Sequence, residues 1–367
     1  MSVKKQLRLY ANLPRLAPVS HFRSEALKHP PLSMYSPLNF LAWMTRVGRY
    51  WFSKKHVYPI MSTPIALMPS VCRIGIAGDW GSGTDEAAMI ATRMQRAYDY
   101  TVHLGDVYFV GSCDEVNENF LGLTSAPGMP GTQYEPVAWP RGTRRTFALC
   151  GNHDMYSNGD GYFDVLLPWL QQTTPYFRLE NDNWVVLGLD TGYNSTGIDF
   201  GPVHPSCAFP DVLINWLRAR PIDEKKSVIV MTHHQPISAF DTAYPTPAKQ
   251  LAEFVKRPFI WIWGHEHRMA VYDFCASPGG VNMYGFCCGH GGMPVELKSP
   301  SGSPRVLFTD MRPYAAAKDM KVGLNGYMDL CFSGNEVKVN FFTLAGTSVC
   351  QDVFMNHEGS VKLSSDR

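Results

Sequence analysis

The sequence has almost no excess of charge, because its 33 Lys and Arg residues nearly balance its 32 Asp and Glu residues. Proteins that bind nucleic acid over a broad surface carry a basic excess, so the composition argues against that class and leaves open only a local basic groove. There is also no run of about 18 apolar residues, which a membrane-spanning helix needs. The first residues are basic but lack the apolar stretch of a secretory signal. We therefore expect a soluble, cytoplasmic protein that binds no nucleic acid.

The nine cysteines lack a pattern as well. They are odd in number, and only Cys287 and Cys288 are neighbours. Because a disulfide framework needs cysteines in pairs, we expect buried free thiols instead. With 367 residues, of which 45% are hydrophobic, the chain can bury one large core and carry an added segment.

Five short polar motifs are the most informative feature that is present. They are GDW (78–80), GDV (105–107), GNHD (151–154), THHQP (232–236) and GHEH (264–267). Each follows a run of apolar residues that is typical of a buried strand. In α/β sheets, ligands bind beyond the carboxyl ends of the strands. We therefore expect the five motifs to converge on one site.

Together the motifs supply carboxylate, amide and imidazole groups, and none of them contains cysteine. Such donors suit Mn, Fe, Zn or Ni, whereas thiolate and iron–sulfur sites need cysteine. Two ions held roughly 3.5–4 Å apart need one shared anionic ligand, and they stabilise both the attacking and the leaving oxygen of a displacement at phosphorus. The motifs therefore predict hydrolysis of a phosphate ester.

In this order the motifs resemble those of the calcineurin-like metallophosphoesterase superfamily, and GDWG with YFVG is similar to its purple acid phosphatase branch. The resemblance covers about residues 71–345. It implies an α/β fold, a four-layer α/β-β/α sandwich of two mixed sheets flanked by helices.

The resemblance also implies a hydrolase with a dinuclear metal centre of Fe, Mn or Zn and a metal-bridging hydroxide nucleophile. We favour a phosphomonoesterase of the acid phosphatase type, acting on a small-molecule or protein phosphate ester. One alternative is a phosphodiesterase on the same scaffold. The other, from a different functional class, is a catalytically silent metal-binding regulatory protein.

The metal ligands implied by the resemblance fall into two sets that share one residue. Asp79 and His267 would bind the first metal, and Asp106 would bridge both metals. The second metal would be bound by Asn152, His234 and His265. On an extended segment His265 and His267 point the same way and Glu266 points opposite, so we expect Glu266 to orient a neighbour or to face solvent.

The two histidines of THHQP compete for one ligand position. The family pattern places Pro two residues after the ligand, which favours His234, with Pro236 as that proline. Strand alternation would turn His233 to the other face. We expect His234 to be the ligand.

His153 is the candidate catalytic residue. It follows the ligand Asn152, and beside a phosphate it could protonate the leaving oxygen or stabilise the phosphoryl group. Asp154 is a candidate to orient it. The alternative is that His153 only packs in the turn.

The sequence departs from the purple acid phosphatase pattern after Asp106. In that branch a Tyr lies three residues beyond the bridging Asp, but here Phe109 takes that position and Tyr108 precedes it. A one-residue deletion could still bring Tyr108 to the metal. We give slight preference to the alternative, that Tyr108 packs and leaves the first metal poor in protein ligands, since Gly81 offers none.

Local patterns predict several elements around the motifs. Thr84 can cap a helix that runs to about Tyr98 and forms a βαβ unit. Pro210 and Asp211 open a second helix. Residues 327–332 and 337–344 read as a hairpin.

The loops at 121–145, 191–209 and 237–248 are expected to lie over or beside the site and to select the substrate. His290 follows a predicted strand in a Gly-rich turn. We expect it to face solvent rather than to contact substrate.

The resemblance divides the chain into an extension (1–70), a catalytic domain (71–345) and a C-terminal tail (346–367). Within residues 40–55 a helical stripe contains apolar side chains, with basic residues beside them, and this pattern resembles an interfacial membrane helix. The stripe comprises Phe40, Trp43, Met44, Val47, Tyr50 and Trp51. We favour packing of this stripe on the catalytic domain or on a second subunit over membrane contact.

Overall fold

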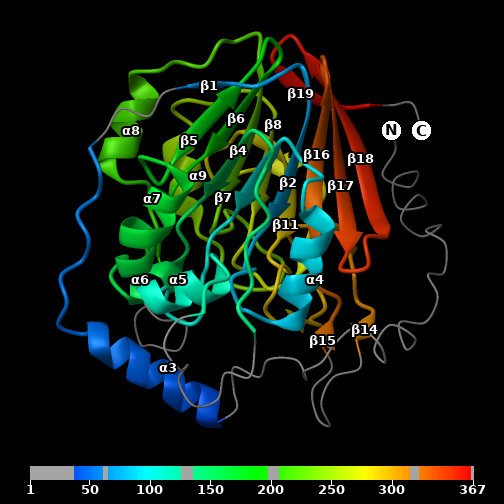
Figure 1. The fold of residues 1–367 in the computed structure, drawn as a ribbon. Helices are drawn as coiled ribbons and strands as arrows, with labels where there is room; N and C mark the ends of the chain where they lie inside the picture. Colours follow the sequence, from blue (N-terminus) through cyan, green and yellow to red (C-terminus); the bar gives the residue numbers. More distant parts are fainter. Residues whose placement is uncertain (1–36, 61–64, 125–134, 197–205, 315–321, 365–367) are drawn as a thin grey trace.

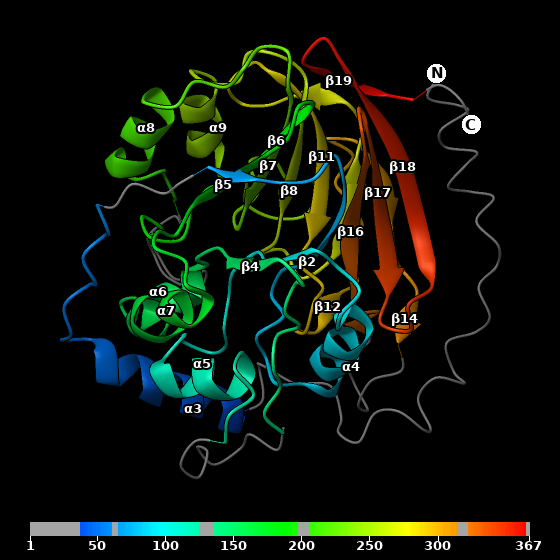
Figure 2. The same cartoon turned by 45° about the horizontal axis from the view of Figure 1, so that its top comes forward.

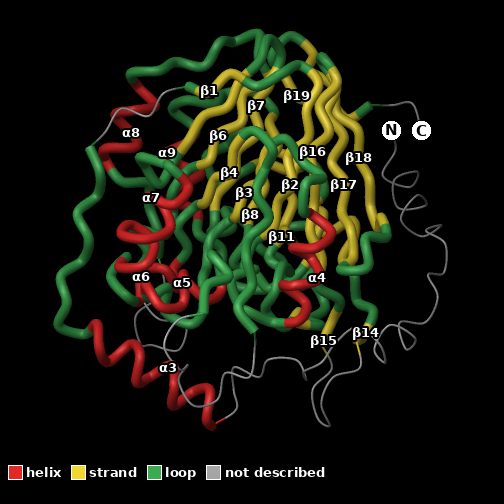
Figure 3. Tube along the Cα trace, viewed as in Figure 1, coloured by secondary structure: helices red, strands yellow, loops and turns green. Residues whose placement is uncertain are grey.

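The computed structural model describes residues 37–60, 65–124, 135–196, 206–314 and 322–364 of the chain (Figure 1). Two large β-sheets pack face to face, and helices lie around their outside (Figure 3). Two of the three loops expected near the site fall partly outside the described residues, at 125–134 and 197–205.

One large sheet has seven strands in the order β19-β18-β17-β16-β2-β3-β4. Its parallel part is formed by β2 (Val71–Ala77), β3 (Tyr100–His103) and β4 (Arg145–Ala148). Its antiparallel part is formed by β16 (Gly326–Ser333), β17 (Glu336–Thr343), β18 (Ser348–His357) and β19 (Ser360–Leu363). The predicted hairpin is therefore confirmed as β16 and β17.

The other large sheet follows the order β1-β5-β6-β7-β8-β11-β9-β13, with β10 paired to β11. Its strands are β1 (Ala66–Leu67), β5 (Phe177–Glu180), β6 (Trp184–Gly188), β7 (Ser227–Thr232), β8 (Phe259–Trp263), β9 (Met269–Tyr272), β10 (Cys275–Ala276), β11 (Asn282–Cys288) and β13 (Val306–Thr309). The central pairs β6·β7, β7·β8 and β8·β11 are parallel, so their carboxyl ends lie at one edge. A small third sheet contains β12 (Val295–Glu296), β14 (Pro313–Tyr314) and β15 (Val322–Gly323).

Strand alternation builds two apolar layers. In β7, Ile229 and Met231 are buried between the two sheets, whereas Val228 and Val230 face the helices. The layer between the sheets also contains Ile76 of the seven-stranded sheet. The predicted four-layer arrangement of two mixed sheets flanked by helices is confirmed (Figure 2).

The helices that start at Asp85 and Asp211 begin where the sequence predicts, whereas a third starts at Pro245, inside the predicted loop 237–248. Helix α4 (Asp85–Met94) starts after Thr84, whose hydroxyl accepts a hydrogen bond from the backbone N–H of Ala87 at 3.2 Å. It joins the parallel strands β2 and β3, which confirms the βαβ unit, and it ends at Met94, before Tyr98. Helix α8 (Asp211–Arg218) and helix α9 (Pro245–Leu251) cover the other sheet.

Shorter helical segments lie at the end of the molecule where the parallel strands finish. They are α5 (Cys113–Asn119), α6 (Asn152–Tyr156), the π-helical turn η2 (Tyr162–Leu166) and α7 (Leu167–Leu170). Helix α3 (Pro37–Tyr50) runs beside α5 and α6 in both views (Figures 1 and 2). Within the described residues, no helix is long and apolar enough to cross a bilayer.

The C-terminal boundary expected at residue 345 does not match the structure. Residues 348–363 form β18 and β19, which continue the seven-stranded sheet and bury Val349, Phe354 and Val361. The sequence does not predict strand β18, because its buried and exposed positions do not alternate regularly. At the other boundary, β1 lies in the expected extension and pairs with β5.

A substitution in β18 tests whether this segment belongs to the core. Phe354 is 1% exposed and its ring lies 4.8 Å from that of Tyr284. We expect Phe354→Ala to lower the free energy of unfolding by about 3–5 kcal/mol, because it leaves a cavity between the sheets. Denaturant unfolding measures the change, with the exposed Lys362→Ala as control. Equal stability of both variants would show that residues 348–363 are a tail.

Candidate metal centre

The five motifs lie a few residues beyond strands of both sheets. Asp79, Asp106 and Asn152 follow β2, β3 and β4, while His233 and His265 follow β7 and β8. Asp79, Asp106 and His265 adopt left-handed backbone conformations, with φ of 57°, 73° and 66°. Such conformations cost about 1–3 kcal/mol each and are kept where the surrounding structure enforces them, often at functional sites. The fold therefore holds these side chains in place against local strain.

Tyr108 lies inside the first donor set. Its hydroxyl oxygen is 2.8 Å from Asp79 Oδ1, 3.2 Å from Asp106 Oδ2 and 3.0 Å from His267 Nε2. Burial, together with the charges of the two carboxylates, raises the pKa of Tyr108. The slight preference for a Tyr108 that only packs is therefore not supported, because its hydroxyl contacts all three residues assigned to the first metal.

His233 lies inside the second donor set. Its Nε2 atom is 3.0 Å from Asn152 Oδ1, 3.3 Å from Asp106 Oδ2 and 3.2 Å from His265 Nδ1. The other ring nitrogen, Nδ1, lies 3.0 Å from the carbonyl oxygen of Leu104, and this contact fixes the orientation of the ring. Asp106 Oδ2 therefore faces both donor sets, as a bridging ligand must.

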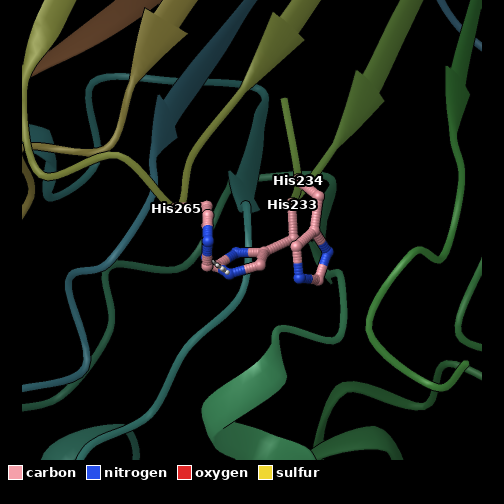
Figure 4. Close-up of side chains that lie close together, drawn as sticks. All are labelled: His233, His234 and His265. Atoms are coloured by element: carbon pink, nitrogen blue, oxygen red, sulfur yellow. Dashed lines mark hydrogen bonds between the residues drawn. The ribbon is translucent and has the colours of Figure 1, made fainter. Parts of the chain in front are cut away.

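His234 is close to this set but has another partner. Its Nδ1 lies 3.0 Å from the hydroxyl of Thr191, and its ring centre lies 4.7 Å from that of His265 (Figure 4). The contacts favour His233 over the expected His234. Strand alternation does not govern the two histidines, because β7 ends at Thr232 and both lie beyond the regular strand. Tyr244, from the third predicted loop, reaches the same group, with its hydroxyl 3.3 Å from His265 Nε2.

The negative charges of the buried Asp79 and Asp106 carboxylates are not fully balanced by nearby positive charge. Burial, with the charge of Asp106 beside it, raises the pKa of Asp79 to about 8. Burial alone would lower the pKa of His233, but Asp106 and Asp79 raise it to about 9. Although burial opposes it, the charge of His233 holds the pKa of Asp106 well below its usual range. One imidazolium cannot neutralise two buried carboxylates, so this cluster favours added cations.

Asp154 and Gly151 fix the position of Asp106. The carboxylate of Asp154 accepts backbone hydrogen bonds from Gly151 at 2.8 Å, Asp106 at 3.1 Å and Val107 at 3.2 Å. A Cβ atom at Gly151 would lie 2.0 Å from Asp106 Oδ1, so only glycine fits there. The expectation that Asp154 orients His153 is therefore wrong, since its oxygens hold the motif turns together.

His153 is oriented by the backbone instead. Its Nδ1 lies 2.7 Å from the carbonyl oxygen of Phe109, and its own backbone N–H donates to Asp106 Oδ1 at 2.9 Å. The ring centre lies 4.5 Å from that of Tyr108. Because the carbonyl oxygen accepts a hydrogen bond from the Nδ1–H group, Nε2 is the ring nitrogen available to a substrate.

Glu266 and His290 are both buried. Glu266 is 4% exposed and accepts hydrogen bonds from the Ser238 hydroxyl and from Trp263 Nε1, so it orients neighbours and does not face solvent. His290 is 2% exposed, which contradicts the expected solvent-facing turn, and burial lowers its pKa to about 4.

Sequence reasoning missed a buried ion pair behind the site. Arg46 of α3 donates to Glu115 of α5, 69 residues away. The carboxylate of Glu115 also accepts the backbone N–H groups of Phe109 at 2.5 Å and Val110 at 2.9 Å. Arg46 and Glu115 therefore hold the loop that follows Tyr108. The only local signal is the capping box of Ser112 and Glu115.

Trp43 adds an apolar contact between helix α3 and the loop that follows Tyr108. It packs in a cluster with Tyr108, Phe109 and Val110, and its ring centre lies 6.1 Å from that of Tyr156. The hydroxyl of Tyr156 accepts a hydrogen bond from Asn152 Nδ2 at 3.0 Å, which leaves Asn152 Oδ1 directed at His233. Helix α3 thus supports both donor sets.

The residues present fit two cations. Donor atoms of Asp79, Asp106 and His233 lie within 4.8 Å of one another, as do those of His233, His234 and His265. Carboxylate, phenol, amide and imidazole donors suit Fe, Mn or Zn, and no cysteine belongs to either group.

Comparisons with known proteins agree with this geometry. The family model described as calcineurin-like phosphoesterase matches residues 72–269. A purple acid phosphatase from yellow lupin (Lupinus luteus) is similar in fold, with 14% identity and a TM-score of 0.51 over 81% of this chain and 54% of the lupin chain. The structure of PhoD gives 12% identity and a TM-score of 0.45, over 83% and 73% of the two chains. This chain therefore matches about half of the lupin protein's length. The search of curated protein sequences gave no match.

Removal of the Arg46 charge tests the support behind the site. We expect Arg46→Met to lower the free energy of unfolding by about 3–5 kcal/mol, because it leaves Glu115 buried without its cation. The double variant Arg46→Met/Glu115→Gln should recover part of this loss. Arg218→Met, which breaks the exposed pair with Glu253, is the matched control and should leave the denaturant midpoint unchanged. If Arg46→Met unfolds at the same midpoint as Arg218→Met, the buried pair does not support the fold.

Proposed function

The chain belongs to the calcineurin-like phosphoesterase family, and on this premise we propose that it hydrolyses phosphate monoesters at a dinuclear metal centre. Family membership makes it a metal-dependent phosphoesterase. The observation that carries the finer proposal is the position of Asp106 Oδ2, which faces Tyr108 on one side and His233 on the other.

The proposed ligands form two sets that share Asp106. The first ion would be bound by Asp79, Asp106, Tyr108 and His267. The second would be bound by Asp106, Asn152, His233 and His265. His234 would lie beside the second set. When bound, two such ions lower the pKa of water and neutralise the charge of the phosphate.

The side chains of the chain itself would do the remaining work. His153 would donate a proton from Nε2 to the leaving oxygen, since its Nδ1 is held by the carbonyl of Phe109. The residue is largely buried, at 8% exposure. Tyr244, beside His265 and His234, would close the far side of the second set.

Tyr108 supports a monoesterase over a diesterase. A phenol among the first set of donors matches the purple acid phosphatase pattern, and the fold is similar to that of the lupin enzyme. A small-molecule or protein phosphate ester would be the substrate, and the cytoplasm remains the expected location.

Metal analysis combined with two substrates tests the proposed activity. We expect about two metal equivalents per chain, and faster turnover of p-nitrophenyl phosphate than of bis-p-nitrophenyl phosphate. Treatment with a chelator should abolish turnover, and Fe, Mn or Zn should restore it. His153→Ala should lower kcat by about 10²–10⁴-fold with the metal content unchanged, because it removes a proton donor and no ligand. The exposed His357→Ala is the control. Faster turnover of the diester would show a phosphodiesterase, and two bound metals without turnover would show the silent regulatory protein.

Ligand substitutions test the two revised assignments. In iron-loaded protein we expect a visible tyrosinate charge-transfer band that Tyr108→Phe abolishes. We expect His233→Ala to lose about one metal equivalent, and His234→Ala to keep both. Absorption spectra and metal content measure these changes. A band that survives in Tyr108→Phe would remove Tyr108 from the ligands, and metal loss in His234→Ala alone would restore the original assignment.

A further inference from the structure

Helix α3 has two different faces. Trp43, Arg46, Val47 and Tyr50 pack toward the catalytic domain. At 100° per residue, the opposite face contains Leu41 and Met44 and continues into the turn at Trp51 and Phe52. The predicted packing of the apolar stripe on the catalytic domain is therefore confirmed for Trp43, Val47 and Tyr50, whereas Met44 and Trp51 lie on the outer side.

The outer side chains are strongly exposed. Leu41 is 63% exposed, Met44 41%, Trp51 70% and Phe52 95%. Single exposed apolar residues are common, whereas a group of exposed apolar side chains on one side of a helix and its following turn is typical of an interaction surface. We refer to Leu41, Met44, Trp51 and Phe52 as the outer apolar face.

Two basic residues lie beside this face. Arg49 and Lys54 are exposed there, and the Lys55 ammonium lies 3.8 Å from the ring centre of Tyr193. Residues 26–78 contain no Asp or Glu.

The charge of the whole chain is divided in the same way. Residues 1–78 carry 11 of the 33 basic residues and one of the 32 acidic residues. The remaining residues therefore carry 22 basic and 31 acidic side chains. Although the net charge is +1, an anionic surface attracts the N-terminal part and repels the rest.

We propose that the outer apolar face, with Arg49 and Lys54, docks onto the surface of an anionic lipid bilayer. Leu41, Met44 and Phe52 would enter the boundary between headgroups and acyl chains, and the indole of Trp51 would lie at the level of the headgroups. Arg49 and Lys54 would contact anionic headgroups.

The charge distribution favours a bilayer over a second copy of the chain. A two-fold interface through this face would bring the Arg49 and Lys54 side chains of two copies close together, with no acidic residue from 26–78 to separate them. A bilayer with anionic lipid satisfies the apolar and the basic side chains at once. Because the inner face of α3 contacts the Tyr108 loop, docking would bring the end of the molecule that contains the metal centre toward the membrane.

Vesicle sedimentation of the full chain tests the proposal. We expect the protein to sediment with vesicles of phosphatidylglycerol and phosphatidylcholine, and not with phosphatidylcholine alone. The variants Trp51→Ser/Phe52→Ser and Lys54→Glu should each weaken binding at least about fivefold, since each removes membrane contacts. Leu67→Ser/Val71→Ser is the matched control, because Leu67 and Val71 are 79% and 70% exposed and lie outside α3. It should bind like the wild type.

The outcomes separate the possible occupants. Turnover of p-nitrophenyl phosphate and the denaturant midpoint should match the wild type in all three variants, which shows that they fold. Wild-type protein that stays in solution with anionic vesicles would overturn the proposal. So would equal binding by Trp51→Ser/Phe52→Ser, which would place the contact elsewhere. A dimeric mass by light scattering that this variant converts to a monomer would show that a second copy covers the face.

Discussion

The site depends on one buried carboxylate, that of Asp106. One of its oxygens faces both the Tyr108 hydroxyl and the His233 imidazole, so the two donor sets can act together only if this side chain stays in place. The fold holds it with backbone hydrogen bonds to Asp154 and with a glycine at 151 that allows close approach. Its backbone is left-handed, with φ of 73°, and the surrounding structure offsets the free-energy cost of this conformation.

Burial of several carboxylates in one cluster has consequences beyond the site. The charge of Asp106 makes it harder to ionise Asp79 and easier to protonate His233, so the cluster favours bound cations. Like charges that are buried close together must be held in place by the surrounding structure. Helix α3 provides part of this support, although it lies outside residues 72–269, which the family model matches. Arg46 neutralises Glu115, which in turn binds the backbone beyond Tyr108. Helix α3 thus packs against the loop beside the candidate site, and its outer face is the proposed membrane contact.

Features encoded by neighbouring residues could be predicted from the sequence. The cap of α4 at Thr84 and the hairpin of β16 and β17 follow from local patterns. The convergence of the motifs follows from their common position after predicted strands. Features set by packing could not. Whether His233 or His234 faces the site depends on where β7 ends. Strand β18 could not be predicted because its buried and exposed positions do not alternate. The pairing of Arg46 with Glu115 spans 69 residues and leaves no periodic signal.

The proposed dinuclear centre requires two metal ions to share the carboxylate of Asp106. Anomalous diffraction from crystals of the manganese-loaded protein measures this most directly. We predict two anomalous peaks roughly 3.5–4 Å apart, with the Asp106 carboxylate between them, Tyr108 beside one peak and His233 beside the other. A single peak, or two peaks of which only one contacts Asp106, would contradict the shared-carboxylate centre.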